Sequence, residues 1–142
     1  MTKVTFEKFT KIPREKIFEA ATDYGSFQKL FSEFYSSVRV ISERPTTTLL
    51  EAHLILSGKE FVVMQKHLIE KPFLHETFFV GGDAKGTQIT EKYDQTKEGT
   101  KITLSVDFKH KRSLGLSGLF GKGEIENEFS KILDRLIEKL EN

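Results

Sequence analysis

The sequence contains no cysteine and no tryptophan, and only 3 prolines occur among its 142 residues. The absence of cysteine excludes disulfide bonds, thiolate metal sites and cysteine nucleophiles. No stretch approaches the roughly 18 apolar residues of a membrane-spanning helix. The first residues, Met1–Lys8, also lack the apolar region of a signal peptide. We therefore expect a cytoplasmic protein.

The sequence also lacks an excess of one charge. It contains 22 basic and 21 acidic residues, and its formal net charge is +1. Such a chain creates no global field that would attract nucleic acid. The basic run Lys109–Arg112 ends a predicted strand and has no interleaved aromatic residues on which bases could stack. We predict no nucleic-acid partner.

Phenylalanine is abundant: it occurs 13 times, beside 3 tyrosines. Its side chain adds apolar bulk without a polar atom that needs a partner, which suits a core and an apolar pocket equally. The length fits one domain, and we find no internal repeat, linker or low-complexity tract. We expect a single domain over residues 1–142.

Hydrophobic periodicity predicts a strand, two short helices, six further strands and one long helix. Pro13 suits the first turn of the first helix, and the spacing from Phe27 to Phe34 indicates the second helix. Turn signals that contain glycine or proline separate the later strands. These six strands are predicted at 35–43, 47–56, 59–71, 74–80, 87–93 and 100–110.

The last helix carries an apolar stripe, and Glu124, Glu126 and Glu128 in its opening turns complement the helix dipole. About 20 residues at ~1.5 Å each span roughly 30 Å, enough to cross a sheet. A helix over a curved antiparallel sheet encloses space, so we predict an α+β fold with an internal cavity. The stripe consists of Ile125, Phe129, Ile132, Leu133, Leu136, Ile137 and Leu140.

Turn lengths predict which strand residues share the face beneath this helix, because side chains alternate with period two. If Ser57-Gly58 and Lys71-Pro72 are two-residue turns, Ala52 opposes Val63 and His67 opposes Glu76. His53 and His75 then lie on the opposite face from His67. The predicted inner face is apolar except for Gln65, His67, Glu76 and Glu91.

This group of polar residues has three interpretations. The group orients the polar end of an apolar ligand, or His67 and Glu76 act as a general acid–base pair. Alternatively, the sheet extends beyond the helix and the group is exposed to solvent. The expected ligand-binding residues are Gln65, His67, Glu76, Phe78, Ile89, Glu91, Tyr93, Leu104, Phe129, Ile132, Leu133 and Leu136.

Metal-ligating patterns are weak. The four histidines, at positions 53, 67, 75 and 110, show neither HxH nor HExxH spacing. We expect no metal site, and we predict no cofactor.

The segment Ser113–Gly123 is rich in glycine and leucine but lacks the glycine order of a phosphate-binding loop. Leu116, Leu119 and Phe120 are candidate gate residues. The segment is either a lid over the cavity entrance, touching the ligand or transiently a membrane, or a loop anchored by its own leucines.

The order of elements resembles the helix-grip fold of the START-like (SRPBCC) superfamily, which includes birch-pollen-allergen-like proteins, aromatase/cyclases and coenzyme Q-binding proteins. The resemblance rests on Ile12–Glu19, Asp23–Phe27, Gly99–Leu104 and the terminal helix, and it covers essentially the whole chain. The sequence looks most like the polyketide cyclase/dehydrase or coenzyme Q-binding subgroup. This resemblance implies a hydrophobic cavity for a lipid, isoprenoid, quinone or polyketide-like molecule, and it transfers no catalytic residues.

Three functions are compatible with these observations. We favour binding or transport of a hydrophobic small molecule over enzymatic activity. The first alternative is a cyclase or dehydratase that uses His67 and Glu76. The second is an interaction module whose filled core lacks a cavity of the ~300 Å³ typical of ligand sites. The sequence indicates no particular oligomeric state.

Overall fold

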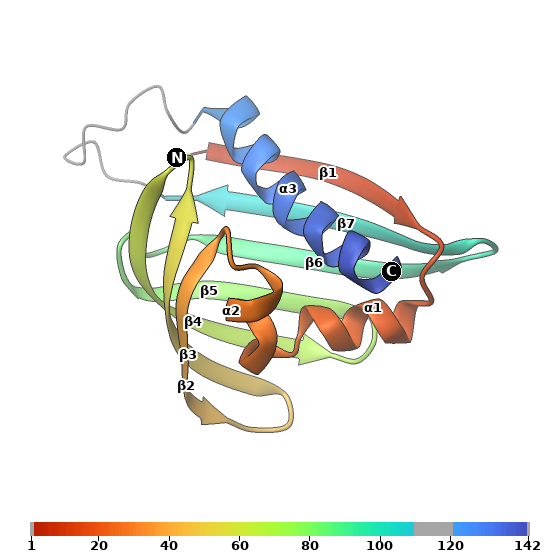
Figure 1. Ribbon diagram of the computed structural model, residues 1–142, viewed down its shortest axis with the longest axis horizontal. Helices are drawn as coiled ribbons and strands as arrows, with labels where there is room; N and C mark the ends of the chain where they lie inside the picture. The colour runs from red at the N-terminus through yellow and green to blue at the C-terminus, as the bar shows by residue number, and fades with distance from the viewer. Residues whose placement is uncertain (1, 110–120, 142) are drawn as a thin grey trace.

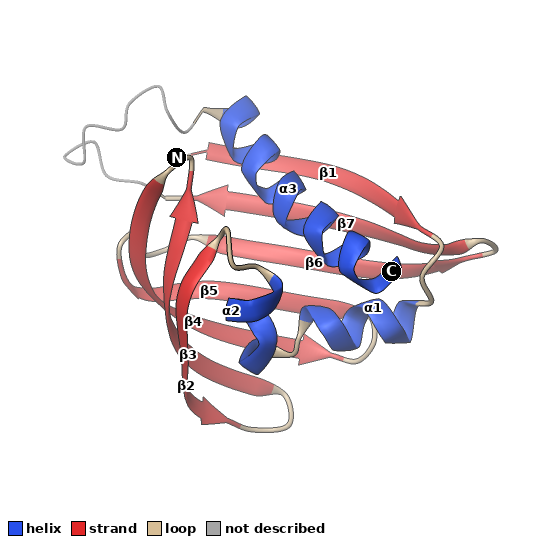
Figure 2. Ribbon diagram, viewed as in Figure 1, coloured by secondary structure: helices blue, strands red, loops and turns tan. Residues whose placement is uncertain are grey.

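The computed structural model describes residues 2–109 and 121–141, which form a seven-stranded sheet and three α-helices (Figures 1 and 2). The predicted order of elements and the α+β helix-grip architecture are confirmed. The elements are β1 (Thr2–Thr10), α1 (Arg14–Ala21), the 3₁₀ turn η1 (Tyr24–Ser26), α2 (Phe27–Leu30), β2 (Tyr35–Glu43), β3 (Thr47–Leu56), β4 (Lys59–Glu70), β5 (Leu74–Gly82), β6 (Gln88–Thr96), β7 (Gly99–Phe108) and α3 (Lys122–Glu141).

The sheet has the strand order β1-β7-β6-β5-β4-β3-β2, and all of its neighbouring strands run antiparallel. Figure 1 shows α3 crossing one face of the sheet, with α1 and α2 beside it. The covered face is the buried one, as the strict alternation of buried and partly buried residues along β3 shows.

The turn between β3 and β4 has the predicted length. Ser57 (φ 49°) and Gly58 (φ 77°) both lie in the left-handed region, as a two-residue type I′ hairpin turn requires. Ala52 therefore pairs with Val63, as predicted.

Helix α3 buries its apolar stripe against this face. Ile125, Phe129, Leu133 and Leu136 are buried, and Ile132 is partly buried against the same core. Full burial of such a side chain contributes about 1.5–3 kcal/mol, so the stripe is the main attachment of the helix.

Polar contacts fix the position of α3 along the sheet. The backbone N–H of Ser57 donates to the buried Glu128 carboxylate, and the Ser57 hydroxyl donates to Glu124. Lys8 Nζ on β1 lies 2.9 Å from Asp134 Oδ1. The helix is therefore tied both to the β3–β4 turn and to β1.

The predicted register between β4 and β5 is wrong by one residue. Glu70 pairs with Leu74, so the connection has three residues, 71–73, rather than two. Because one additional residue reverses the alternation of side chains, His67 opposes Thr77 and Glu76 opposes Leu68. The inner face of β5 consequently carries the buried residues His75, Thr77 and Phe79, and not Glu76 and Phe78.

Candidate ligand-binding site

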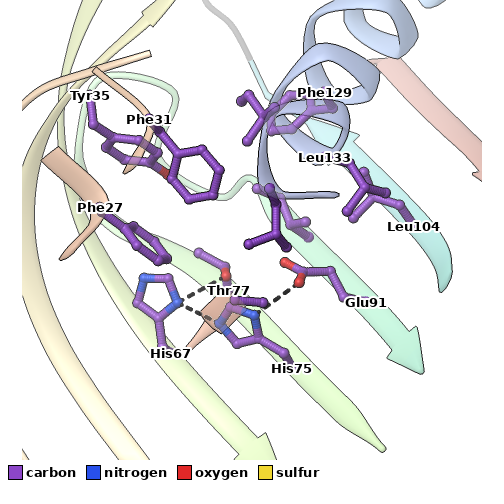
Figure 3. A pocket seen from close by; sticks show the side chains of 14 residues that line it. Phe27, Phe31, Tyr35, His67, His75, Thr77, Glu91, Leu104, Phe129 and Leu133 are labelled. Carbon is purple, nitrogen blue, oxygen red and sulfur yellow. Dashed lines mark hydrogen bonds and ion pairs between the residues drawn. The ribbon is translucent and has the colours of Figure 1, made fainter. Parts of the chain in front are cut away.

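A cavity of about 70 Å³ lies between α3 and the sheet. Figure 3 shows Phe27, Phe31 and Tyr35 on one side of it and Phe129 and Leu133 on the other. This volume is well below the ~300 Å³ expected of a typical ligand pocket. The lining residues are Ala21, Phe27, Phe31, Tyr35, His67, His75, Thr77, Ile89, Glu91, Leu104, Phe129, Ile132, Leu133 and Leu136.

Most of the residues predicted to bind the ligand lie around this cavity. His67, Ile89, Glu91, Leu104, Phe129, Ile132, Leu133 and Leu136 line it.

Four predicted binding residues do not line the cavity. Gln65 and Tyr93 are fully buried and contact polar residues of the lining. Glu76 and Phe78 lie on the opposite face of β5, because of the register change described above. The candidate gate residues Leu116, Leu119 and Phe120 lie outside the described residues.

Sequence reasoning missed six lining residues. They are His75 and Thr77 on β5, Ala21 on α1, Phe27 on α2, Phe31 just after α2, and Tyr35 at the start of β2. The β5 sequence has apolar residues at both parities, so its alternation alone could not identify the inner face. A three-residue turn at 71–73 would have placed His75 and Thr77 correctly.

Four polar side chains form a continuous row across β4, β5 and β6, which we call the polar row: Gln65, His67, His75 and Glu91. His67 Nε2 lies 2.8 Å from Gln65 Oε1, and His67 Nδ1 lies 2.9 Å from His75 Nε2. His75 Nδ1 lies 3.1 Å from Glu91 Oε1. The row therefore connects the interior of β4 with a carboxylate in the cavity wall.

Neighbouring hydroxyl groups surround the polar row. The Thr77 hydroxyl lies 3.1 Å from His67 Nδ1, and the Tyr24 hydroxyl lies 3.2 Å from His75 Nε2. The Tyr93 hydroxyl donates to Glu91 Oε1. The rings of His67 and His75 stack with their centroids 5.1 Å apart, and Tyr24 packs against His67 at 4.3 Å. These contacts hold the two imidazoles in fixed orientations.

No family model matches the sequence, and no curated protein matches it either. Among solved structures, a START superfamily protein from Mycobacterium smegmatis is similar to this chain, with a TM-score of 0.77 at 14% identity over 99% of each chain. The Zhui aromatase/cyclase from Streptomyces sp. R1128 has a TM-score of 0.74 at 12% identity, over 98% of this chain and 93% of that one. The chain has a START-like helix-grip fold. A protein from Thermus thermophilus has the same fold, with a TM-score of 0.75 at 16% identity over 96% of this chain and 98% of that one.

Within this helix-grip fold, burial controls the protonation of the polar residues. Burial, and then the neighbouring His75, holds the pKa of His67 well below its usual range, so His67 is neutral at neutral pH. Burial, and then the Glu91 carboxylate, raises the pKa of both Tyr24 and Tyr93. Burial also raises the pKa of Tyr35 to about 12. The tyrosines therefore act as neutral hydrogen-bond donors or acceptors.

The predicted His67–Glu76 pair is absent from the site. Glu76 lies on the other face of the sheet, and the carboxylate that reaches the histidines is Glu91. Within residues 2–109 and 121–141, no group of three or more His, Cys, Asp or Glu side chains could hold a metal ion. In the same part of the chain, no helix is long and apolar enough to cross a membrane.

Proposed function

We propose that the protein binds a hydrophobic small molecule between α3 and the sheet. The observation that carries this proposal is an apolar cavity that ends at the polar row. Ligand sites commonly combine an apolar lining with a few convergent polar groups that orient the ligand. In this site, His75 and Glu91 are placed to orient one polar end.

The size of the cavity limits what can enter without rearrangement. A volume of about 70 Å³ accommodates only a small group, so a lipid, isoprenoid, quinone or polyketide-like ligand requires the walls to move outward. An ion pair between Arg135 on α3 and Glu33, just after α2, links the two sides of the cavity. Glu33 is exposed and Arg135 is partly exposed, so we expect this pair to break at little cost, since surface ion pairs contribute about 0–1 kcal/mol.

Two alternatives have unequal support. The small volume favours an interaction module with a filled core, which the experiment below distinguishes from a ligand-binding protein. A cyclase or dehydratase is supported by the structural likeness to the Zhui aromatase/cyclase, which is a likeness of fold. Because His67 and Glu76 lie on opposite faces, we assign no catalytic role to that pair.

A neutral apolar probe, 4-butylbenzyl alcohol, tests the proposal by amide NMR titration. We expect saturable shifts confined to residues around the cavity. Ala21 lines the cavity, so Ala21→Leu should fill it and weaken binding by about tenfold or more, equivalent to about 1.4 kcal/mol. The neighbouring Ala20 does not line it, and Ala20→Leu is the matched control for the same chemical change.

The outcomes separate the candidates. Saturable binding that Ala21→Leu weakens and Ala20→Leu preserves supports a ligand-binding protein. An absence of saturable binding by the wild-type protein would overturn the proposal in favour of a filled core. Native mass spectrometry of protein purified from its own host would then identify any natural ligand that copurifies.

A further inference from the structure

The two buried histidines constrain the number of protons in the polar row. His67 Nδ1 and His75 Nε2 lie 2.9 Å apart, so one proton must lie between them. Two lone pairs would repel each other at this distance, and two N–H groups would collide. If Gln65 Oε1 accepts from His67 Nε2, the His75–Glu91 pair must hold an additional proton and is neutral overall.

The side-chain amide of Gln65 favours the opposite arrangement. Its nitrogen is buried and makes no hydrogen bond of normal geometry within the described residues. An amide oxygen and nitrogen have nearly the same shape, and their assignment follows from the hydrogen-bond network. Turning this amide directs its N–H to His67 Nε2 and its oxygen toward the neighbouring Tyr35 hydroxyl.

With the amide turned, each histidine carries one proton, on Nδ1. His67 Nδ1–H then donates to His75 Nε2. The protonated His75 Nδ1 lies 3.1 Å from Glu91 Oε1, a close polar contact outside normal hydrogen-bond geometry. Tyr93 donates to Glu91, and the Tyr24 hydroxyl shares the single lone pair of His75 Nε2 with His67 Nδ1–H. The Gln65 nitrogen thereby gains a partner, and no additional proton remains on the His75–Glu91 pair, so Glu91 is a carboxylate in this arrangement.

One oxygen of Glu91 remains available to a ligand. Both Tyr93 and His75 approach Oε1. None of the described residues forms a hydrogen bond or an ion pair with Oε2. In Figure 3 the second carboxylate oxygen points into the cavity. The described residues that line the cavity include no lysine or arginine. An anionic acceptor therefore faces a mostly apolar space whose described lining supplies no lysine or arginine to compensate its charge.

Building on the proposed function, we infer that the ligand carries a protonated amine that pairs with Glu91 Oε2, and that anionic amphiphiles are rejected. An ammonium group would form a charge-assisted hydrogen bond with the carboxylate. A carboxylate or phosphate would be buried beside a like charge with no partner, which is strongly unfavourable. A neutral alcohol donates a weaker hydrogen bond and should bind with intermediate affinity.

Three probes with one apolar body test this inference by isothermal titration calorimetry near neutral pH: 4-butylbenzylamine, 4-butylbenzyl alcohol and 4-butylbenzoic acid. We expect the amine to bind about tenfold more tightly than the alcohol, and the acid about tenfold more weakly. Glu91→Gln should reduce the spread among the three dissociation constants to about threefold. Glu76→Gln, on the opposite face of the sheet, should retain the wild-type ranking.

The ranking on the wild-type protein is decisive even if Glu91→Gln does not fold. Acid binding as tight as amine binding would overturn the inference and leave the proposed function standing. Failure of all three probes to bind would overturn both. As an independent readout, histidine ¹⁵N NMR should show His67 and His75 as neutral rings protonated at Nδ1. A doubly protonated His75 would overturn the proposed proton arrangement.

Discussion

His67 is a fully buried imidazole whose nearest ring neighbours include a second histidine. Burial and His75 lower its folded-state pKa, whereas a histidine in the unfolded chain titrates near 6.5. As the pH falls below about 6.5, the unfolded chain binds a proton that folded His67 does not accept. The free energy of unfolding should therefore decrease on acidification, by up to about 1.4 kcal/mol per pH unit from this residue.

Urea unfolding of the wild-type protein and His67→Asn, between neutral pH and about pH 5, tests this expectation. His67→Asn should lower stability at neutral pH but weaken the pH dependence. His53→Asn is the control. His53 is partly exposed, so a proton on its ring does not place a charge inside the core. Equal pH slopes for the wild-type protein and His67→Asn would contradict the burial argument.

At the scale of single elements, α3 depends on one buried carboxylate. Glu128 accepts a hydrogen bond from the backbone N–H of Ser57 and lies 3.2 Å from Lys131 Nζ. Glu128→Ala should destabilise the protein by about 1–3 kcal/mol, because the Ser57 N–H loses its acceptor. Glu128→Gln keeps an acceptor oxygen and should lose less. Glu126→Ala, at an exposed position of the same helix, should be nearly neutral. Urea unfolding measures the stability of all three variants. Equal losses of stability for Glu128→Ala and Glu126→Ala would refute the role of Glu128 in holding α3.

The same residue illustrates what could be predicted for α3. The apolar stripe and the helix were predictable because both follow from local periodicity. Glu128 was interpreted as one of three carboxylates that complement the helix dipole. Its position three residues after Ile125 already placed it on the buried face, but its partner Ser57 is 71 residues away in the sequence. A partner at this sequence separation cannot be predicted from a local sequence pattern.

Strand β5 shows the corresponding limit for the sheet. Its existence and pairing partners were predictable, but its inner face depended on whether the preceding turn had two or three residues. One extra residue exchanged Glu76 for His75 and Thr77 in the cavity wall. Ile89, Glu91 and Leu104 nevertheless line the cavity, because Thr77 on the inner face of β5 pairs with Ile89, and Glu91 pairs with Leu104.

For the whole molecule, the fold was more predictable than the cavity. The order of elements follows from periodicity and turn chemistry, which are encoded locally. The volume of the cavity instead depends on how side chains such as Phe27, Phe31 and Phe129 fill the space under α3. Packing of that kind is a property of the assembled core, where a few ångströms decide whether a ligand has room.

Tyrosine ionisation links the site to the stability of the whole fold. All 3 tyrosines of the chain, Tyr24, Tyr35 and Tyr93, are buried. Their folded-state pKa values are raised, to about 12 for Tyr35, whereas an unfolded tyrosine titrates near 10. Between about pH 10 and 12, the unfolded chain releases phenol protons that the folded protein retains. Stability should therefore fall as the pH rises, by up to about 4 kcal/mol per pH unit while all three phenols stay protected.

A typical domain has about 5–15 kcal/mol of stability, so this alkaline loss exhausts it within a few pH units. Phenolate absorbance should accordingly rise in one cooperative step, above pH 10, together with the loss of far-ultraviolet circular dichroism. In concentrated guanidinium chloride the same absorbance should rise near pH 10 without cooperativity. A rise near pH 10 in protein that keeps its native circular dichroism would place at least one phenol in contact with solvent. That result would also weaken the description of the site, because Tyr24 contacts the polar row from a buried position and Tyr93 donates to Glu91 only while it remains protonated.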